Sequence, residues 1–530
     1  RVEPDAVRPG NGPAAERGTK RGGGEGVRTL NSGKNFLVTI SLMVTMTLLG
    51  FVTRKLFVNE IGVEYLGLNG LLTNILAAVT LLESGFGTSV VFHLYKPLAE
   101  NDRPRILALL QFYRKVYRII AAAVFVLCLC LYPFLGCFIK DEGHLDYLAL
   151  VYFIFVFNSI LPYLTAYKNS LINADQKNYR LGAINFIYQV GLNLSKLAIL
   201  YWTGNYVLYL VVESLFLAGF NVAMVRKVDA LYPYVRSRVS HALDAVTKSQ
   251  IVVNVKALFL HSVGGYFMHS TSNIVISSFV GLAAVGFYSN YMLVVGTIST
   301  FIMQVINSMA ESVGNLIASE DRGHVYEIFK RVFLINFLIS GVSSIVLLNT
   351  LNPFIVWWLG PEYMLSGACS FVIILNFFVV GMRRSAMVFK TKAGIFHQDR
   401  YSPLLQGVIN VALSVTLVQW WGITGVLLAA TLSLLSIGVW QFPRLVYRHV
   451  FHQPLRRYFI TYGWYLLLAA AGYALTYPLC ARSYFSSPLA DLFMWGIISV
   501  VIPLGLDVLV LFRTSPFRGL MGHMRTLACR

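Results

Sequence analysis

Four apolar stretches of the sequence carry polar side chains spaced three or four residues apart, a spacing that puts side chains on one face of a helix. Polar side chains are costly when they face lipid but not when they face a water-filled cavity. These rows of polar side chains are therefore predicted either to face inward along a polar path or to form hydrogen bonds between helices. They comprise Thr297, Thr300, Gln304, Asn307, Glu311 and Asn315; Asn185, Gln189, Asn193 and Lys196; Thr73, Thr80, Glu83, Ser84 and Gly87; and Gln406, Asn410 and Ser414.

Charged side chains in or beside the same stretches are the groups that could act on a substrate. Arg or Lys in a wet cavity can hold a phosphate or pyrophosphate, whereas an acid can carry a proton or sodium ion or pair with a cation. Lys196 is thus either a cavity cation or the structural partner of an acid such as Glu213, and the other cations could instead reach the membrane surface. The cations are Arg54, Lys55, Lys196 and Lys256, and the acids are Glu83, Glu213 and Glu311.

Catalytic and metal-binding motifs do not stand out in the sequence. It has no Ser/His/Asp spacing, glycine-rich phosphate loop or metal-ligand cluster that rises above chance, and its six Cys form no disulfide framework. We therefore expect no enzyme, no metal site and no bound cofactor. Any driving force would come from a coupled ion such as H⁺ or Na⁺, or from metabolic pull.

The elements that position these residues follow from composition. The 530 residues are 56% hydrophobic and only 13% charged, with a mean hydropathy of +0.64, which excludes an ordinary soluble domain. Apolar runs of roughly 20 residues, long enough to cross a bilayer as helices, recur along the chain. The fourteen runs lie near residues 36–57, 66–95, 117–138, 146–167, 180–202, 205–226, 252–280, 286–316, 332–357, 366–388, 401–420, 423–443, 458–478 and 488–512.

The net charge of +19 would suit a nucleic-acid partner, but its distribution follows the membrane instead. Thirty-seven of the 43 Lys and Arg fall in the N-terminal tail and in every second loop after it. Short cytoplasmic loops carry such an excess, so the pattern predicts cytoplasmic termini and no nucleic-acid partner. The exceptions are Arg54, Lys55, Lys140 and Arg482 on the other side, and Lys196 and Lys256 within spans.

The two halves of the chain resemble each other. The segment Ile61–Leu68 matches Val280–Phe287 with both glycines kept, and at the same shift Ala99–Arg103 meets Ala318–Arg322. Each half has six runs, an even number, so both copies enter the membrane with the same orientation. Parallel repeats of this kind are a transporter architecture, in which two bundles can rock about a path between them.

The predicted fold is an all-α integral membrane protein of about fourteen transmembrane helices, with two six-helix bundles as parallel repeats and two extra C-terminal helices. The predicted segments are a disordered cytoplasmic tail (1–33), an N-terminal bundle (34–227), a cytoplasmic connector (228–251), a C-terminal bundle (252–445), two extra helices (446–515) and a cytoplasmic tail (516–530).

Over roughly residues 34–450, the chain resembles the polysaccharide transporter family of Wzx-like lipid-linked oligosaccharide and O-antigen flippases. This family lies within the larger group that includes multidrug and toxic-compound extruders. The resemblance is carried by Gly62–Leu68, Leu82–Gly87, and Tyr95–Ala99 followed by the basic Phe112–Tyr117. It implies a core of two six-helix bundles around a central cationic cavity that takes an undecaprenyl-pyrophosphate-linked glycan.

The resemblance also implies a bacterial cytoplasmic membrane, membrane lipid as surroundings, and a polysaccharide polymerase and other assembly proteins as partners. The expected function is therefore a flippase that moves a lipid-linked oligosaccharide to the outer leaflet. A cation-coupled multidrug extruder of the same fold is the alternative, and short outer loops speak against a membrane glycosyltransferase. Candidate substrate-binding residues are Arg54, Lys55, Lys196, Lys256, Asn185, Gln189, Asn193, Gln304 and Asn307, and candidates for ion coupling or charge pairing are Glu83, Glu213 and Glu311.

Overall fold

The described part of the chain is almost entirely helical. The computed structural model describes residues 43–140, 147–237, 239, 241–395 and 397–528, and no strand occurs among them. Residues Thr53–Arg530 form one compact unit, to which the following description refers. Residues 43–52 belong to a separate unit and are helical. The predicted tail, residues 1–33, lies outside the described residues.

Many of these helices suit a lipid environment. Among the described residues, ten helices are long and apolar enough to cross a membrane, or eleven when a bent pair, Leu148–Leu164 and Ala166–Ala174, counts as one span. Large apolar side chains such as Phe92, Ile119 and Trp202 lie exposed on the helix surfaces, where lipid would cover them. The chain is a multi-pass membrane protein, and the count of fourteen spans stays a prediction.

The N-terminal lobe holds seven of the described helices. Two of them begin at side-chain caps: Asp102 accepts a hydrogen bond from the Arg105 N–H, and Asn205 accepts one from the Leu208 N–H, which satisfies N–H groups that the first helical turn leaves free. The helices are α2 (Val63–Thr80), α3 (Phe86–Glu100), α4 (Arg103–Leu131), α5 (Leu148–Ile160), α6 (Ala166–Ala174), α7 (Gly182–Thr203) and α8 (Tyr206–Leu231), with short 3₁₀ turns η1 (Leu81–Glu83), η2 (Tyr132–Phe138), η3 (Leu161–Leu164), η4 (Asn178–Leu181) and η5 (Pro233–Arg236).

The C-terminal lobe holds another seven described helices, α9 to α15. The run expected at 252–280 is broken at Ser270 into two helices, α9 and α10. The helices are α9 (Ala245–His269), α10 (Thr271–Phe279), α11 (Leu282–Ser319), α12 (Arg322–Trp358), α13 (Gly367–Lys392), α14 (Ser402–Ser433) and α15 (Val439–Val446), with the turns η6 (Pro361–Tyr363) and η7 (His397–Asp399) and the π-helical turns η8 (Leu434–Gly438) and η9 (Tyr447–Phe451).

The long α14 contains a chain reversal. Gly422 has a non-helical backbone, φ 53° and ψ −131°, and a Cβ at Gly425 would meet the carbonyl oxygen of Leu417. Eight residues of continuous helix would separate these positions by about 12 Å, so the chain folds back on itself. α14 thus contains the run predicted at 401–420 and the first part of the run predicted at 423–443, which continues through η8 and α15.

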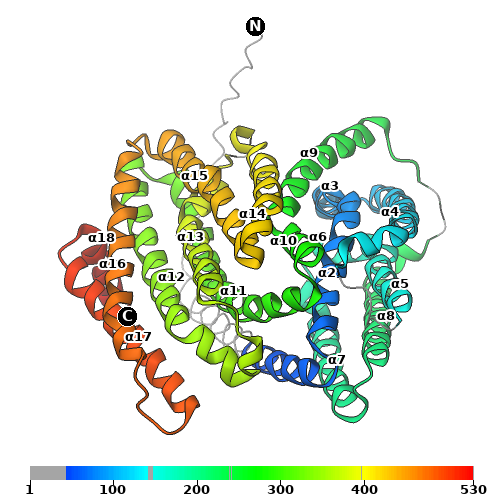
Figure 1. The fold of residues 1–530 in the computed structure, drawn as a ribbon. Helices are drawn as coiled ribbons and strands as arrows, with labels where there is room; N and C mark the ends of the chain where they lie inside the picture. Colours follow the sequence, from blue (N-terminus) through cyan, green and yellow to red (C-terminus); the bar gives the residue numbers. More distant parts are fainter. Residues whose placement is uncertain (1–42, 141–146, 238, 240, 396, 529–530) are drawn as a thin grey trace, which may run out of the picture. The chain divides into compact units, whose positions relative to one another are not determined.

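The two lobes meet through a reciprocal contact between α2 and α11, which pack side by side (Figure 1). A Cβ at Gly67 would meet the carbonyl oxygen of Leu282, and a Cβ at Gly286 would meet that of Val63. The sequence repeat aligns Gly67 with Gly286 and Val63 with Leu282. Each lobe therefore makes the same contact with the other, as parallel repeats related by an approximate twofold axis should.

Three helices follow the repeat: α16 (Arg456–Cys480), α17 (Pro488–Leu511) and α18 (Ser515–Ala528). They pack beside α12, in orange and red in Figure 1. The Asn349 amide of α12 donates to the hydroxyls of Thr476 on α16 and Ser499 on α17, at 2.9 Å each. This buried junction fixes the two extra spans to the C-terminal lobe.

Candidate functional site

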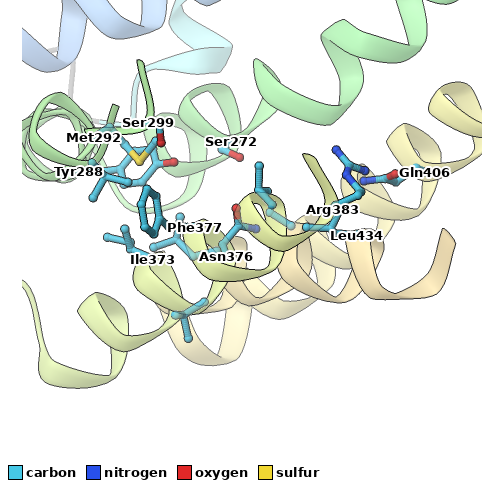
Figure 2. A pocket seen from close by; sticks show the side chains of 15 residues that line it. Ser272, Tyr288, Met292, Ser299, Ile373, Asn376, Phe377, Arg383, Gln406 and Leu434 are labelled. Atoms are coloured by element: carbon cyan, nitrogen blue, oxygen red, sulfur yellow. The ribbon is translucent and has the colours of Figure 1, made fainter. Parts of the chain in front are cut away.

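A cavity of about 240 Å³ lies inside the C-terminal lobe, among α10, α11, α13, α14 and η8. Its lining combines one cation with amides, hydroxyls and aromatic rings, and none of the described lining residues is acidic. We call it the C-lobe cavity (Figure 2). It is lined by Ser272, Tyr288, Met292, Val295, Ser299, Val372, Ile373, Asn376, Phe377, Val380, Arg383, Gln406, Leu427, Ala430 and Leu434.

Arg383 is the charged group of the C-lobe cavity. It is only 9% exposed, and its Nη1 atom has no hydrogen-bond partner within the described part of the chain. Its guanidinium lies over the Phe442 ring, 5.0 Å from the centroid, and against Gly438, where a Cβ would collide with Nη1. A buried guanidinium without a carboxylate partner is costly, so this site is suited to an anion that enters the cavity.

The remaining groups give the C-lobe cavity two different ends. In Figure 2, Arg383 extends toward Gln406, whereas Tyr288, Met292 and Phe377 gather at the opposite end. Between the two ends lies Asn376 of α13, whose amide donates to Thr431 of α14 at 3.3 Å. Such a lining can hold a charged group at one end and an apolar or sugar surface at the other.

A second cavity, of about 570 Å³, lies inside the N-terminal lobe, and we call it the N-lobe cavity. Its two charged groups neutralise each other, because Lys196 Nζ lies 2.9 Å from Glu213 Oε2. The same ammonium lies over the Tyr209 ring at 4.6 Å. The lining residues are Asn69, Thr73, Leu76, Ala77, Thr80, Phe155, Asn158, Ser159, Pro162, Tyr163, Lys196, Tyr209, Leu210 and Glu213.

The two cavities occupy equivalent places in the repeat. At the shift that aligns Gly67 with Gly286, four of the five α2 residues that line the N-lobe cavity fall on α11 residues that line the C-lobe cavity. The two lobes thus enclose corresponding spaces with different charge. The aligned pairs are Asn69 and Tyr288, Thr73 and Met292, Leu76 and Val295, and Thr80 and Ser299.

Of the predicted charged residues, the structure brings Lys196 and Glu213 together and places two others close by. The half-buried Arg54 lies near enough to Tyr209 for electrostatic interaction, and its Nη1 has no hydrogen-bond partner among the described residues. Glu83, at the break between α2 and α3, accepts a hydrogen bond from the Tyr117 hydroxyl at 3.2 Å. Neither Arg54 nor Glu83 lines either cavity.

The other predicted site residues whose side chains the structure describes also lie outside the linings of both cavities. Gln189 and Asn193 are half-buried, and the Asn193 amide donates to the Gln189 carbonyl at 2.8 Å. The side chain of Glu311 lies outside the described part of the structure. The remaining five side chains are exposed: Lys55, Lys256, Asn185, Gln304 and Asn307.

The chain is similar to known proteins in its fold. Neither a protein-family model nor a curated protein matches the sequence. A structure of the lipid II flippase MurJ in an inward closed conformation matches 90% of this chain and 99% of its own, with a TM-score of 0.65 and 11% identity. An inward-facing multidrug resistance MATE family transporter of the MOP superfamily matches 76% and 96%, with a TM-score of 0.56 and 11% identity. A MATE transporter of Vibrio cholerae matches 78% and 96%, with a TM-score of 0.52 and 13% identity.

The chain has the fold of the MOP-superfamily transporters. Within the MOP fold, one neighbour is named a flippase and two are named multidrug or MATE transporters, so the fold alone does not choose between these activities. No group of three or more His, Cys, Asp or Glu that could hold a metal ion occurs among the described residues. The choice between a flippase and a multidrug transporter therefore depends on the charged residues that line the cavities.

The sequence prediction missed Arg383 and its neighbour Arg384. It extended the span to residue 388, past both arginines, but counted both with the following cytoplasmic loop, because basic residues at the end of an apolar run are typical of cytoplasmic ends. In the MOP fold of this chain, α13 runs to Lys392 and buries both guanidiniums. The apolar residues of the segment Ser385–Phe389, which follow the two arginines, were the signal that both arginines lie within the helix and not in the loop.

Proposed function

We propose that this protein is a flippase that moves an undecaprenyl-pyrophosphate-linked oligosaccharide, such as an O-antigen or capsule repeat unit, from the cytoplasmic to the outer leaflet of a bacterial cytoplasmic membrane. The observation that carries the proposal is Arg383, a buried cation whose Nη1 has no hydrogen-bond partner among the described residues, in a cavity whose described lining holds no acid. We also propose that both termini are cytoplasmic and that the protein acts as members of the Wzx-like family do.

The chemistry of Arg383 fits a pyrophosphate. A guanidinium presents a planar fork of N–H donors that matches phosphate oxygens, and burial strengthens the attraction because little water screens it. Gln406 and Asn376 would supply neutral polar groups beside the phosphates or the first sugar. The polyprenyl tail would stay in lipid, while the head group passes through a central passage as the lobes rock about the α2–α11 contact.

A cation-coupled multidrug extruder of the same fold is the second candidate. Acids buried in membrane helices favour it, since such groups can carry a proton or sodium ion. Glu83 lies at the break between α2 and α3, and Asp507 of α17 is only 4% exposed. Neither Glu83 nor Asp507 lines either cavity, and for this reason we rank the flippase first, with these acids as candidates for ion coupling.

Transport by the purified protein in proteoliposomes separates the two functions. One set of vesicles carries a fluorescent undecaprenyl-pyrophosphate oligosaccharide and reports its movement between leaflets; a second set reports efflux of an organic cation under a proton or sodium gradient. We expect movement of the lipid-linked glycan by the wild type. Ion-driven efflux of the cation, without movement of several lipid-linked glycans, would contradict the flippase and favour the extruder.

A further inference from the structure

A third cavity lies at one end of the N-terminal lobe and is strongly basic. It is an open groove of about 870 Å³ that runs along α4 and is closed on its other sides by α6 and the start of the connector at η5. We call it the α4 groove. Its lining contains five cations, which are Arg114, Lys115, Arg118, Lys168 and Arg236.

Three of these cations are available to a ligand. Arg114, Lys115 and Arg118 are exposed, and no ion pair joins them to a carboxylate within the described ranges. By contrast, Asp229 already binds the other two, at 2.6 Å from Lys168 and 3.5 Å from Arg236. The free cations therefore come from a single helix, and their charge is not neutralised by neighbouring carboxylates.

The wall beside the free cations is apolar. Leu107, Leu110, Ile119 and Ala122 line the same groove, and Ile119 is 59% exposed. The exposed Ile119 and Ala122 follow the cations along α4, toward the apolar run predicted at 117–138, so the upper part of an acyl chain could lie there beside a head group. Basic residues alone would suit any anion, whereas basic residues at the end of an apolar wall suit an anionic lipid.

The groove also touches the segment that joins the two lobes. Gln111, in the middle of the lining, donates from Nε2 to the Val239 carbonyl at 2.6 Å and accepts from the His241 N–H at 3.1 Å. Arg236, from the same connector, reaches into the groove. A ligand held between α4 and Arg236 would therefore strengthen the attachment of the connector to α4.

We infer that the α4 groove binds an anionic phospholipid of the cytoplasmic leaflet, with its phosphate at Arg114 and Arg118 and an acyl chain along Ile119 and Ala122. The Lys and Arg distribution puts this end of α4 at the cytoplasmic surface, where such lipids are enriched. This lipid is distinct from the transported substrate, and its binding does not depend on the proposed function.

Photo-crosslinking of the full-length protein tests this inference. The protein is reconstituted in phosphatidylcholine vesicles that contain increasing amounts of a photoreactive phosphatidylglycerol, and mass spectrometry quantifies labelled peptides from residues 103–131. We expect saturable labelling in the wild type. The variant Arg114→Gln/Arg118→Gln should require about tenfold more phosphatidylglycerol, because each basic residue near a membrane surface contributes severalfold to the attraction.

The control variant Arg448→Gln/Arg456→Gln removes two exposed arginines from the side that is likewise predicted to be cytoplasmic, and its labelling should match the wild type. Size-exclusion profiles check that each variant is folded. Equal labelling by photoreactive phosphatidylcholine, or an unchanged titration in the Arg114→Gln/Arg118→Gln variant, would overturn the inference. Displacement of the label by millimolar glycerol phosphate would also overturn it, because the groove would then bind a soluble phosphate.

Discussion

The N-lobe and C-lobe cavities differ in how their cations are neutralised. Both are enclosed by corresponding helices of the repeat, and α2 and α11 contribute aligned residues to them. Lys196 is held by Glu213 in the N-lobe cavity, whereas Arg383 in the C-lobe cavity has an Nη1 atom without a partner in the described structure. The repeat supplies two spaces, and among their described lining residues only Arg383 of the C-lobe cavity is a cation free to meet an anion.

This difference gives the two cations different roles. A paired charge in a cavity mainly stabilises the fold, because removing one partner leaves the other without compensation. An unpaired buried charge carries a cost that a bound anion relieves. We therefore propose that Arg383 binds the substrate and that the Lys196–Glu213 pair stabilises the fold.

The largest expected effect is on transport in Arg383→Gln. Hydrogen bonds to charged groups contribute about 1.5–3 kcal/mol, so the initial rate of glycan translocation in proteoliposomes should fall about 10-fold to 100-fold. Arg383→Lys should keep part of the activity, because it keeps the charge but loses the fork. Arg384→Gln is the matched control, since Arg384 is equally buried but does not line the cavity. An equal loss in Arg384→Gln would assign the effect to folding.

The next effect concerns the contact that the two lobes share. Gly67→Ala and Gly286→Ala each force a methyl group against a backbone carbonyl of the other lobe, and overpacking of this kind costs up to about 3 kcal/mol. Because the contact is reciprocal, we expect similar losses of thermal stability in detergent for the two variants. Gly296→Ala, where no atom lies within 4 Å of the added Cβ, should be neutral. A large loss in only one glycine variant would contradict the approximate twofold relation.

A smaller effect is expected from the N-lobe ion pair. Lys196→Met leaves Glu213 without its partner and should lower the free energy of unfolding by about 1–3 kcal/mol, less than for a fully buried pair because the Glu213 side chain is 35% exposed. The double variant Lys196→Met/Glu213→Gln should recover most of that loss. Thermal unfolding with a transport assay measures both properties. Stable Lys196→Met protein that has lost transport would make Lys196 a substrate ligand.

The smallest perturbation tests whether the two lobes share one orientation. Gly204 and Gly422 have φ values of 56° and 53° and occupy the outer turns that the sequence predicts in the two lobes. In a background without the native Cys, we expect Thr203→Cys and Trp421→Cys, beside these turns, to react with an impermeant maleimide outside the cell. The variants Glu100→Cys and Ser319→Cys should react only after the membrane is opened. Opposite labelling of the members of either pair would exclude parallel repeats.

The helical membrane fold and its repeat could be predicted because both follow from local patterns that are visible in the amino-acid sequence. Apolar run length set the spans, and the glycines at positions 67 and 286 recur at one shift because each must admit a backbone carbonyl from the other lobe. The break at Ser270 between α9 and α10 was missed, since both helices are apolar and no Pro marks the break.

The site was harder to predict, because the spacing of polar residues does not tell which face of a helix is covered. The row on α11 containing Gln304 and Asn307 is exposed there, whereas Tyr288 and Ser299 of the same helix line the C-lobe cavity. Arg383 was counted as a loop residue on charge statistics alone. Burial depends on which helices pack around a residue, and that information lies in contacts between distant parts of the chain.

The most direct test of the account measures binding with and without the charge on each partner. A glycan linked to undecaprenyl pyrophosphate and the same glycan linked to the uncharged polyprenol are titrated against wild-type and Arg383→Gln protein in lipid nanodiscs. We expect the wild type to prefer the pyrophosphate form by about tenfold or more. The Arg383→Gln variant should lose this preference and bind the neutral form normally. An unchanged preference in Arg383→Gln would contradict the assignment of the anion site to the C-lobe cavity.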